Sequence, residues 1–208
     1  MVKFVAMRKF PDFTPDNRLA FRMISFSVRC LILPLLVASS LFTVSCKTTP
    51  KSSDVIVSVR DQKLGIYDTS GKLVRSYKIS TSKFGLGDTP GSNCTPLGKH
   101  EIVAKIGHGL PKGAVLKSRS WNGEVIQPNA PGRDPIVSRI LWLKGLESKN
   151  KNAFNRFIYI HGTPEEKNLG KPASYGCIRM GMTDVIKLFE DLGIGTTVEI
   201  TPKKLPRS

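Results

Sequence analysis

Short segments with strand character, separated by turn-forming residues, constrain the fold of this chain of 208 residues most strongly. These segments are rich in β-branched residues or alternate apolar and polar side chains, and both patterns are typical of β-strands. They cover residues 55–59, 63–67, 73–79, 136–143, 157–160 and 195–200. The turn sequence Asp68-Thr69-Ser70-Gly71 between the second and third segments predicts a hairpin. Short strands at this spacing predict a mainly β domain, either a sandwich or a barrel.

One stretch near the C-terminus has the periodicity of a helix instead. Its apolar residues recur at spacings of three, four and seven, which places them on one helical face. They are Val185, Leu188, Phe189 and Leu192. The sequence therefore predicts a single amphipathic helix. Residues 107–135, rich in Gly, Pro, Asn and Arg, predict long loops with room for a short hairpin.

The N-terminal region has the features of an export signal. Residues 30–45 (CLILPLLVASSLFTVS) form an apolar run that follows several arginines. A membrane-spanning helix needs about 20 apolar residues, so this shorter run fits the core of a signal peptide better. The sequence Thr43-Val44-Ser45-Cys46 resembles a bacterial lipobox, which makes Cys46 the expected site of lipid attachment.

These features divide the chain into four parts. We expect a signal peptide over residues 1–45, a lipid-anchor cysteine and polar linker over 46–53, a globular domain over 54–201 and a tail over 202–208. The expected location is the cell envelope or periplasm, where a lipid tethers the domain to a membrane without spanning it.

The charge of the chain is strongly basic, at +16 from 32 Lys and Arg against 16 Asp and Glu. Such a balance often accompanies nucleic-acid binding. An exported domain instead meets anionic polymers, lipid head groups and peptide carboxylates, so we expect no nucleic-acid partner. The three histidines and four cysteines have no zinc-type spacing, and we expect neither a metal nor another cofactor.

A histidine and a cysteine carry the clearest chemical signal. His161 follows the apolar run Ile158-Tyr159-Ile160, and Cys177 lies sixteen residues later in a turn of small residues. A thiol becomes a strong nucleophile only as the thiolate, and a nearby imidazole accepts its proton. Papain-like hydrolases have these two residues in the reverse order along the chain. The order therefore indicates a cysteine nucleophile and a histidine base of a different class.

The residues around this pair resemble the L,D-transpeptidase catalytic domain of the YkuD type. The matching positions are His161, Gly162, Ser174, Gly176, Cys177, Ile178 and Arg179. A second stretch, residues 95–102 (TPLGKHEI), resembles a Thr-Pro-x-Gly segment that lies upstream in the same family. Tyr175 stands where the family usually has a second histidine, so the role of that histidine is not carried over. The resemblance implies that residues 54–201 are an L,D-transpeptidase catalytic domain with a YkuD-like β-sandwich or barrel.

The resemblance also implies a reaction. Cys177 attacks the carbonyl that links an L-centre to a D-residue in a peptidoglycan stem peptide, and His161 acts as general base and then general acid. An amine of a second stem, or of a protein, then takes the acyl group. The implied role is peptidoglycan biosynthesis, and thus cell-wall biogenesis and cell shape, with stem peptides as partners.

Five further residues receive expected roles around the nucleophile. Ser174 is the candidate for orienting His161, and the turn at Gly176 is the candidate oxyanion site. Arg179, Tyr175 and Gly162 are candidate substrate-binding residues. For Arg179, a structural salt bridge is an equal alternative to a bound substrate carboxylate.

Two other functions stay open on the sequence alone. With water as the acceptor, the same residues give an L,D-carboxypeptidase. A lipoprotein that binds the cell wall without catalysis is the other alternative, because an oxidising compartment allows a disulfide between Cys94 and Cys177 that would block the nucleophile.

Overall fold

The computed structural model describes residues 54–206, so the expected signal peptide, Cys46 and the linker lie outside the described residues. Within this range the domain is mainly β, as predicted, with one α-helix, α1 (Met182–Asp191), and two short 3-10 helices, η1 (Ser148–Asn150) and η2 (Glu166–Asn168). The strands are β1 (Asp54–Ser58), β2 (Lys63–Tyr67), β3 (Leu73–Ser80), β4 (Gly98–Ile106), β5 (Ala114–Lys117), β6 (Ser120–Val125), β7 (Val137–Gly145), β8 (Tyr159–Gly162), β9 (Ile178–Met180) and β10 (Thr197–Thr201). No helix in this part of the chain has the length and apolar character needed to cross a membrane.

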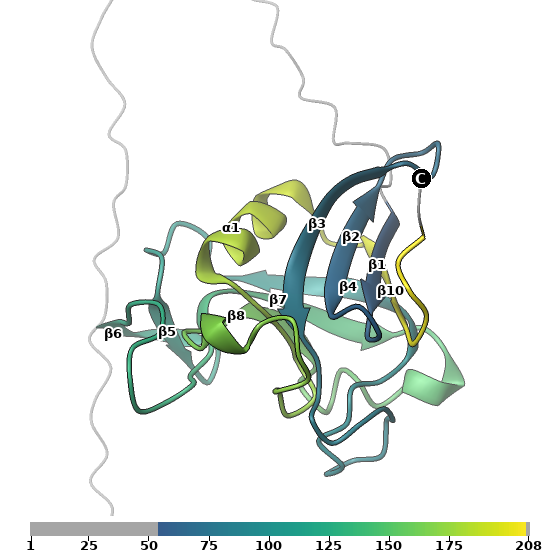
Figure 1. Ribbon diagram of the computed structural model, residues 1–208. Helices are drawn as coiled ribbons and strands as arrows, with labels where there is room; N and C mark the ends of the chain where they lie inside the picture. The colour runs from purple at the N-terminus through teal and green to yellow at the C-terminus, as the bar shows by residue number, and fades with distance from the viewer. Residues whose placement is uncertain (1–53, 207–208) are drawn as a thin grey trace, which may run out of the picture. The chain divides into compact units, whose positions relative to one another are not determined.

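The strands form one sheet that closes on itself (Figure 1). Their order is β4-β10-β1-β2-β3-β9-β8-β7-β5-β6, and β4 also pairs with β7. This extra pairing makes a closed ring of all strands except β5 and β6, whose hairpin extends from the ring at β7. The predicted β2–β3 hairpin is present and antiparallel, whereas β1–β10 and β8–β9 are parallel pairs.

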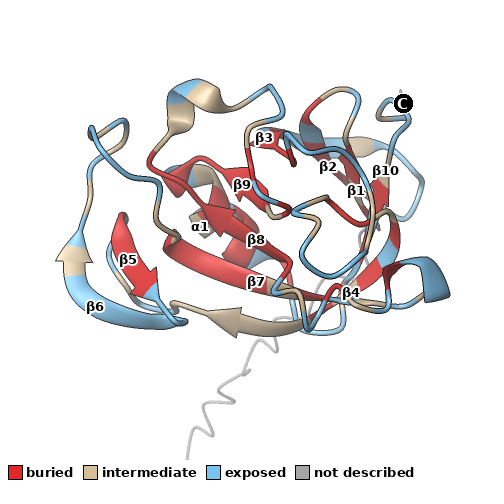
Figure 2. Cartoon of the chain, turned by 90° about the horizontal axis from the view of Figure 1, so that it is seen from below, coloured by how far each residue is buried: buried red, intermediate tan, exposed pale blue. Residues whose placement is uncertain are grey.

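The core follows from the alternation of side chains along these strands. Val55, Val57, Leu64 and Ile79 are buried on one face of the first strands, and Ile160 and Ile178 continue this face on β8 and β9. Figure 2 shows β7, β8 and β9 side by side as a largely buried centre. The predicted apolar face of α1 packs into the same core through Val185, Leu188 and Phe189, and Leu192, the residue directly after the helix, joins them.

The region over residues 107–135 contains the short hairpin for which the sequence left room. Strands β5 and β6 turn at Ser118 and Arg119, both of which have positive φ angles of 50° and 68°. Left-handed backbone at two consecutive residues is typical of a tight two-residue hairpin turn. The hairpin contributes Leu116 to a second apolar cluster, with Ile140 and Tyr159, on the face of β8 opposite the main core.

Candidate active site

His161 and Cys177 lie on the same face of two neighbouring strands. The parallel pairing of β8 and β9 aligns Ile160 with Ile178 and His161 with Arg179. Because Ile160 and Ile178 point into the main core, His161 and Arg179 point to the opposite face. Cys177 directly precedes β9 and packs against the second apolar cluster on that opposite face. The pairing of β8 with β9 thus brings His161 and Cys177, sixteen residues apart in the sequence, onto neighbouring strands.

The thiol of Cys177 is half-buried and protonated at neutral pH. The thiol donates to the Phe157 carbonyl at 3.3 Å and accepts a hydrogen bond from the Tyr159 N–H at 3.4 Å. Burial raises the pKa of this thiol to about 11, although the Tyr159 N–H and the charges of Arg156 and Arg179 act in the opposite direction. Because the thiol does not ionise by itself at pH 7, nucleophilic attack requires a base.

The His161 ring is suited to be that base. The ring is 5% exposed, and its Nδ1 lies 2.9 Å from the Gly162 carbonyl oxygen. A carbonyl only accepts, so Nδ1 carries the proton and Nε2 keeps its lone pair. Burial lowers the pKa of His161 to about 4, with the Gly162 carbonyl and Asp134 acting against this shift. The ring is therefore neutral at pH 7. Among the described residues, no hydrogen bond joins it to the thiol, which is turned toward Phe157.

The prediction that Ser174 orients His161 is wrong in this structure. The Ser174 hydroxyl donates to the Cys177 carbonyl at 2.6 Å and accepts from the Gly176 N–H at 3.2 Å, and the Ser174 carbonyl accepts from the Lys83 N–H. All of these contacts hold the turn rather than the imidazole. The Gly162 carbonyl fixes the ring instead, because it lies next to His161 in the same strand.

The turn itself needs glycine at position 176. Gly176 has a φ of 116°, and a Cβ added there would lie 3.2 Å from the Cys94 carbonyl oxygen. The Gly176 N–H is occupied by Ser174, so it is not the free oxyanion donor that the sequence suggested. The oxyanion hypothesis then rests on the other N–H groups of the turn, those of Tyr175 and Cys177.

Gly162 and Tyr175 differ sharply in exposure. Gly162 is buried, and a Cβ there would lie 2.5 Å from the Val137 carbonyl oxygen. Because of this crowding, Gly162 is better suited to hold His161 in position than to make the predicted contact with substrate. Tyr175 is 62% exposed, its hydroxyl accepts a hydrogen bond from Lys83 Nζ at 3.0 Å, and its ring packs on Phe84 with centroids 5.3 Å apart. Tyr175 is thus available to a ligand.

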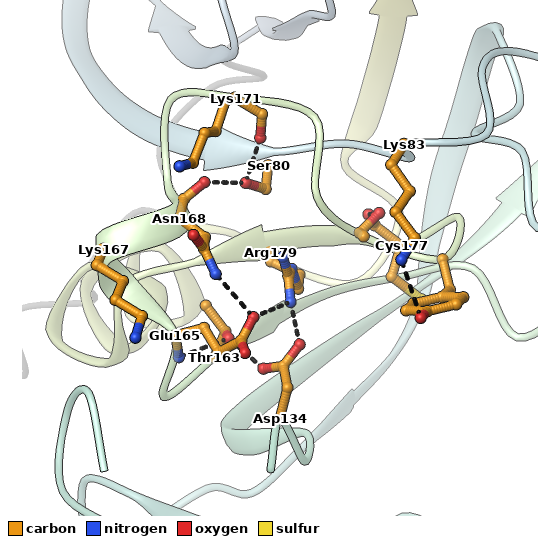
Figure 3. Close-up of polar contacts among 12 residues, drawn as sticks. Ser80, Lys83, Asp134, Thr163, Glu165, Lys167, Asn168, Lys171, Cys177 and Arg179 are labelled. Atoms are coloured by element: carbon orange, nitrogen blue, oxygen red, sulfur yellow. Dashed lines mark hydrogen bonds and ion pairs between the residues drawn. The ribbon is translucent and has the colours of Figure 1, made fainter. Parts of the chain in front are cut away.

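Arg179 forms structural salt bridges, which the sequence analysis gave as the alternative to binding a substrate carboxylate. The residue is 3% exposed, and its Nη1 pairs with Asp134 and, at 3.3 Å, with Glu165 (Figure 3). Thr163, directly after β8, donates its hydroxyl to Asp134. Sequence reasoning missed both carboxylates. A buried arginine requires an acidic partner, but nothing local to Arg179 indicates residues 14 and 45 positions away.

A buried ion pair outside the predicted site supports the catalytic turn. Arg156 pairs with Asp88 at 3.1 Å, with side chains 8% and 7% exposed, and its Nη2 donates to the Cys94 carbonyl at 2.7 Å. Thr95, next to Cys94, donates its hydroxyl to the Gly176 carbonyl at 2.9 Å. Arg156 thus anchors the loop over residues 84–95, and Thr95 connects that loop to the turn that carries Cys177.

Replacing Arg156 by Met is expected to lower the free energy of unfolding by about 3–5 kcal/mol, because Asp88 would remain buried without its partner. Chemical denaturation measures this loss. Arg75→Met is the matched control, since the Arg75–Asp191 pair is 46% and 40% exposed and such pairs contribute about 0–1 kcal/mol. Equal losses in the two variants would contradict the proposed support.

Cys94 and Cys177 are both free thiols in the structure. Cys94 Sγ lies 3.3 Å from the Phe84 carbonyl and 3.6 Å from the Ser92 carbonyl. The disulfide that would have blocked the nucleophile is thus not formed in this state.

The fold and the site define a class: a closed β domain in which a cysteine and a neutral histidine share one face of two parallel strands. Comparison with known proteins assigns the family. The chain belongs to the YkuD family, the L,D-transpeptidase catalytic domain, whose model matches residues 52–200.

Two relatives carry L,D-transpeptidase as a provisional name. YqjB of Bacillus subtilis is 28% identical over 152 residues, which is 73% of each chain. YkuD of Bacillus licheniformis is 49% identical over 148 residues, 71% of this chain and 65% of that protein. Among solved structures, an L,D-transpeptidase from Mycobacterium smegmatis is 16% identical with a TM-score of 0.47, covering 72% of this chain and 58% of its own. The chain thus spans less than two thirds of the second relative and of this structure.

Proposed function

We propose that this domain is a peptidoglycan L,D-transpeptidase that works through a cysteine acyl-enzyme. The observation that carries the proposal is the neutral His161 ring, which has its Nδ1 proton committed to Gly162 and shares a sheet face with Cys177. Membership of the L,D-transpeptidase catalytic domain family supports stem peptides as the substrate class.

The proposed first half-reaction forms a thioester. The Cys177 thiol leaves the Phe157 carbonyl, and His161 Nε2 takes its proton as Sγ attacks the carbonyl between the L-centre and the D-residue. The carbon–nitrogen bond then breaks, and His161 returns the proton to the departing amine of the D-residue. N–H groups of the turn stabilise the negative oxygen of the tetrahedral intermediate.

The second half-reaction transfers the acyl group. An amine attacks the thioester carbonyl, the carbon–sulfur bond breaks, and the proton of the amine passes through His161 to the thiolate. The product is a cross-link between stems or a protein attached to the wall. Export and lipid attachment at Cys46 belong to the same proposal and rest on the sequence. The mass of the mature N-terminal peptide tests that attachment.

The direct test incubates the purified domain with a stem tetrapeptide, with and without an amine acceptor, and follows enzyme and peptide by mass spectrometry. We expect an acyl-enzyme that has lost the terminal D-residue of the donor, and a cross-linked product only when the acceptor is present. Tripeptide as the only product in both samples would instead indicate a carboxypeptidase. Absence of an acyl-enzyme, with intact tetrapeptide, would indicate a wall-binding protein without catalysis.

A further inference from the structure

One edge of β3 has no neighbouring strand over most of its length. On the other edge, β2 pairs with β3 along almost the whole strand. On this edge, β9 pairs only with Ile79 and Ser80. Within the part of the chain that the structure describes, residues 73–78 are therefore open on the side of β3 that faces α1 (Figure 1).

The backbone of Ser76 is directed toward this open edge. Ile79 donates its N–H to the Gln62 carbonyl at 3.0 Å, on the side of β2. Because inward and outward residues alternate in an antiparallel pair, the N–H groups of Ser76 and Lys78 are directed away from β2. Neither of these N–H groups, nor the Ser76 carbonyl, has a hydrogen-bond partner within residues 54–206. An unpaired row of this kind is a template for another strand.

A cavity of about 1150 Å³ lies along the same edge. Four consecutive residues of β3, 75–78, line it. Successive side chains of a strand point to opposite faces, so only the edge of β3 presents all four to one cavity. The far wall is α1, which runs along the edge from Gly181, directly after β9, to Asp191, which pairs with Arg75. The lining includes neither residue of the catalytic pair, so this is a separate site.

Two lysines lie side by side on the outer face of the sheet at this edge. Lys63 of β2 is directly opposite Lys78 of β3, and both side chains are exposed. Neither lysine has a salt bridge to another described residue. Like charges directly opposite one another destabilise a sheet. A strand added at the edge would place a side chain opposite Lys78 on the same face, and an acidic side chain there would offset the repulsion.

The far wall limits what can pair with this edge. A neighbouring strand lies about 4.8 Å away, so a single extended peptide needs little width between β3 and α1. A second copy of the domain would have to bring its own β3, with α1 beside it, into space that α1 already occupies. The cavity therefore suits a peptide segment better than a whole domain.

We infer that the open edge of β3 binds an extended acidic segment of a partner protein, which adds to the sheet as a further strand. Backbone hydrogen bonds to Ser76 and Lys78 supply affinity, and an aspartate or glutamate opposite Lys78 supplies specificity. The binding of this partner does not depend on the proposed acyl transfer.

The test titrates the purified ¹⁵N-labelled protein with synthetic peptides and follows the backbone amides by NMR. Three capped hexapeptides alternate valine and threonine and differ at one central threonine position, which carries glutamate, glutamine or lysine. We expect the glutamate peptide to shift the amide signals of Ser76 and Lys78. It should bind about two- to five-fold more tightly than the glutamine peptide, as for a partly exposed charge pair, and the lysine peptide should bind most weakly. Equal affinities, or no shift at these two amides with millimolar peptide, would overturn the inference.

Methylation of the peptide backbone tests strand addition itself. One version of the glutamate peptide carries N-methyl groups on alternate residues, and a second version carries them on the remaining residues. Only alternate N–H groups of an added strand face β3. One version should therefore lose about ten-fold in affinity, and the other should bind as before. Loss in both versions, or in neither, would rule out pairing with the edge.

A substitution in the protein tests the charge contact. Lys78→Gln should remove the preference for glutamate over glutamine and leave the fold intact, because Lys78 is exposed. Lys99→Gln is the matched control, since Lys99 is an exposed lysine on β4 and lies off the cavity. A preference that survives Lys78→Gln, or disappears in Lys99→Gln, would refute the assignment of the acidic side chain to Lys78.

Discussion

Cys177→Ala is expected to lower the rate of acyl transfer by about 10⁴-fold or more, as removal of the nucleophile does in other covalent hydrolases. The structure gives the reason, because the described residues bring only this thiol onto the sheet face of His161. The loss is measured as release of the terminal D-residue from a tetrapeptide. A carbapenem gives a second readout, since its strained amide should acylate Cys177 and add its mass to the protein.

Cys94→Ser provides the control for this prediction. The Cys94 Sγ makes hydrogen-bond contacts with carbonyls of its own loop, and the Cys94 carbonyl that accepts from Arg156 is retained in the variant. We expect normal rates and a normal carbapenem adduct. An adduct that persists in Cys177→Ala and disappears in Cys94→Ser would identify Cys94 as the nucleophile and contradict the prediction.

His161→Gln is expected to lower the rate by about 10²- to 10⁴-fold, the range for loss of a general acid–base group. The pH profile of the unmodified domain is the sharper measurement. His161 acts as base only when neutral, and burial lowers its pKa to about 4, so activity should persist as the pH falls from 7 to about 5 and decline through pH 4. A decline centred near 6.5, the ordinary histidine value, would contradict this environment.

The lowered pKa of His161 also makes the folded domain less stable at acidic pH. Because the folded pKa lies below the unfolded value, the unfolded chain binds the proton first as the pH falls from about 6.5 to 4, and the free energy of unfolding decreases over this range. His108→Gln is the control for both measurements. His108 is exposed on a loop, so its replacement should leave the pH dependence of rate and stability unchanged.

The sequence predicted the parts of this fold that depend on local pattern. Alternation identified the β2–β3 hairpin, and helical spacing identified the buried face of α1. Strand β4 was noticed only as a motif over residues 95–102, because its closing partner β7 lies some 40 residues further along the chain. Ring closure depends on that distant pairing, which no local pattern specifies.

The site divides in the same way. His161 and Cys177 were found because a short motif surrounds each of them. Asp134, Glu165 and the Arg156–Asp88 pair were missed because the chain has 16 acidic residues and only the folded topology places these few beside buried arginines. Ser174 was assigned to His161 because the sequence shows a hydroxyl near the nucleophile, whereas the fold directs that hydroxyl into the turn and uses the Gly162 carbonyl for the ring.

The position of β10 has a consequence for the synthesis of the protein. This strand, formed by Thr197–Thr201, lies between β1 and β4 and joins the beginning of the domain to its middle. A growing chain that lacks it leaves two strand edges unpaired and the ring open. Pairings between such distant segments form late, so the domain gains its native core only after almost all of it has been made.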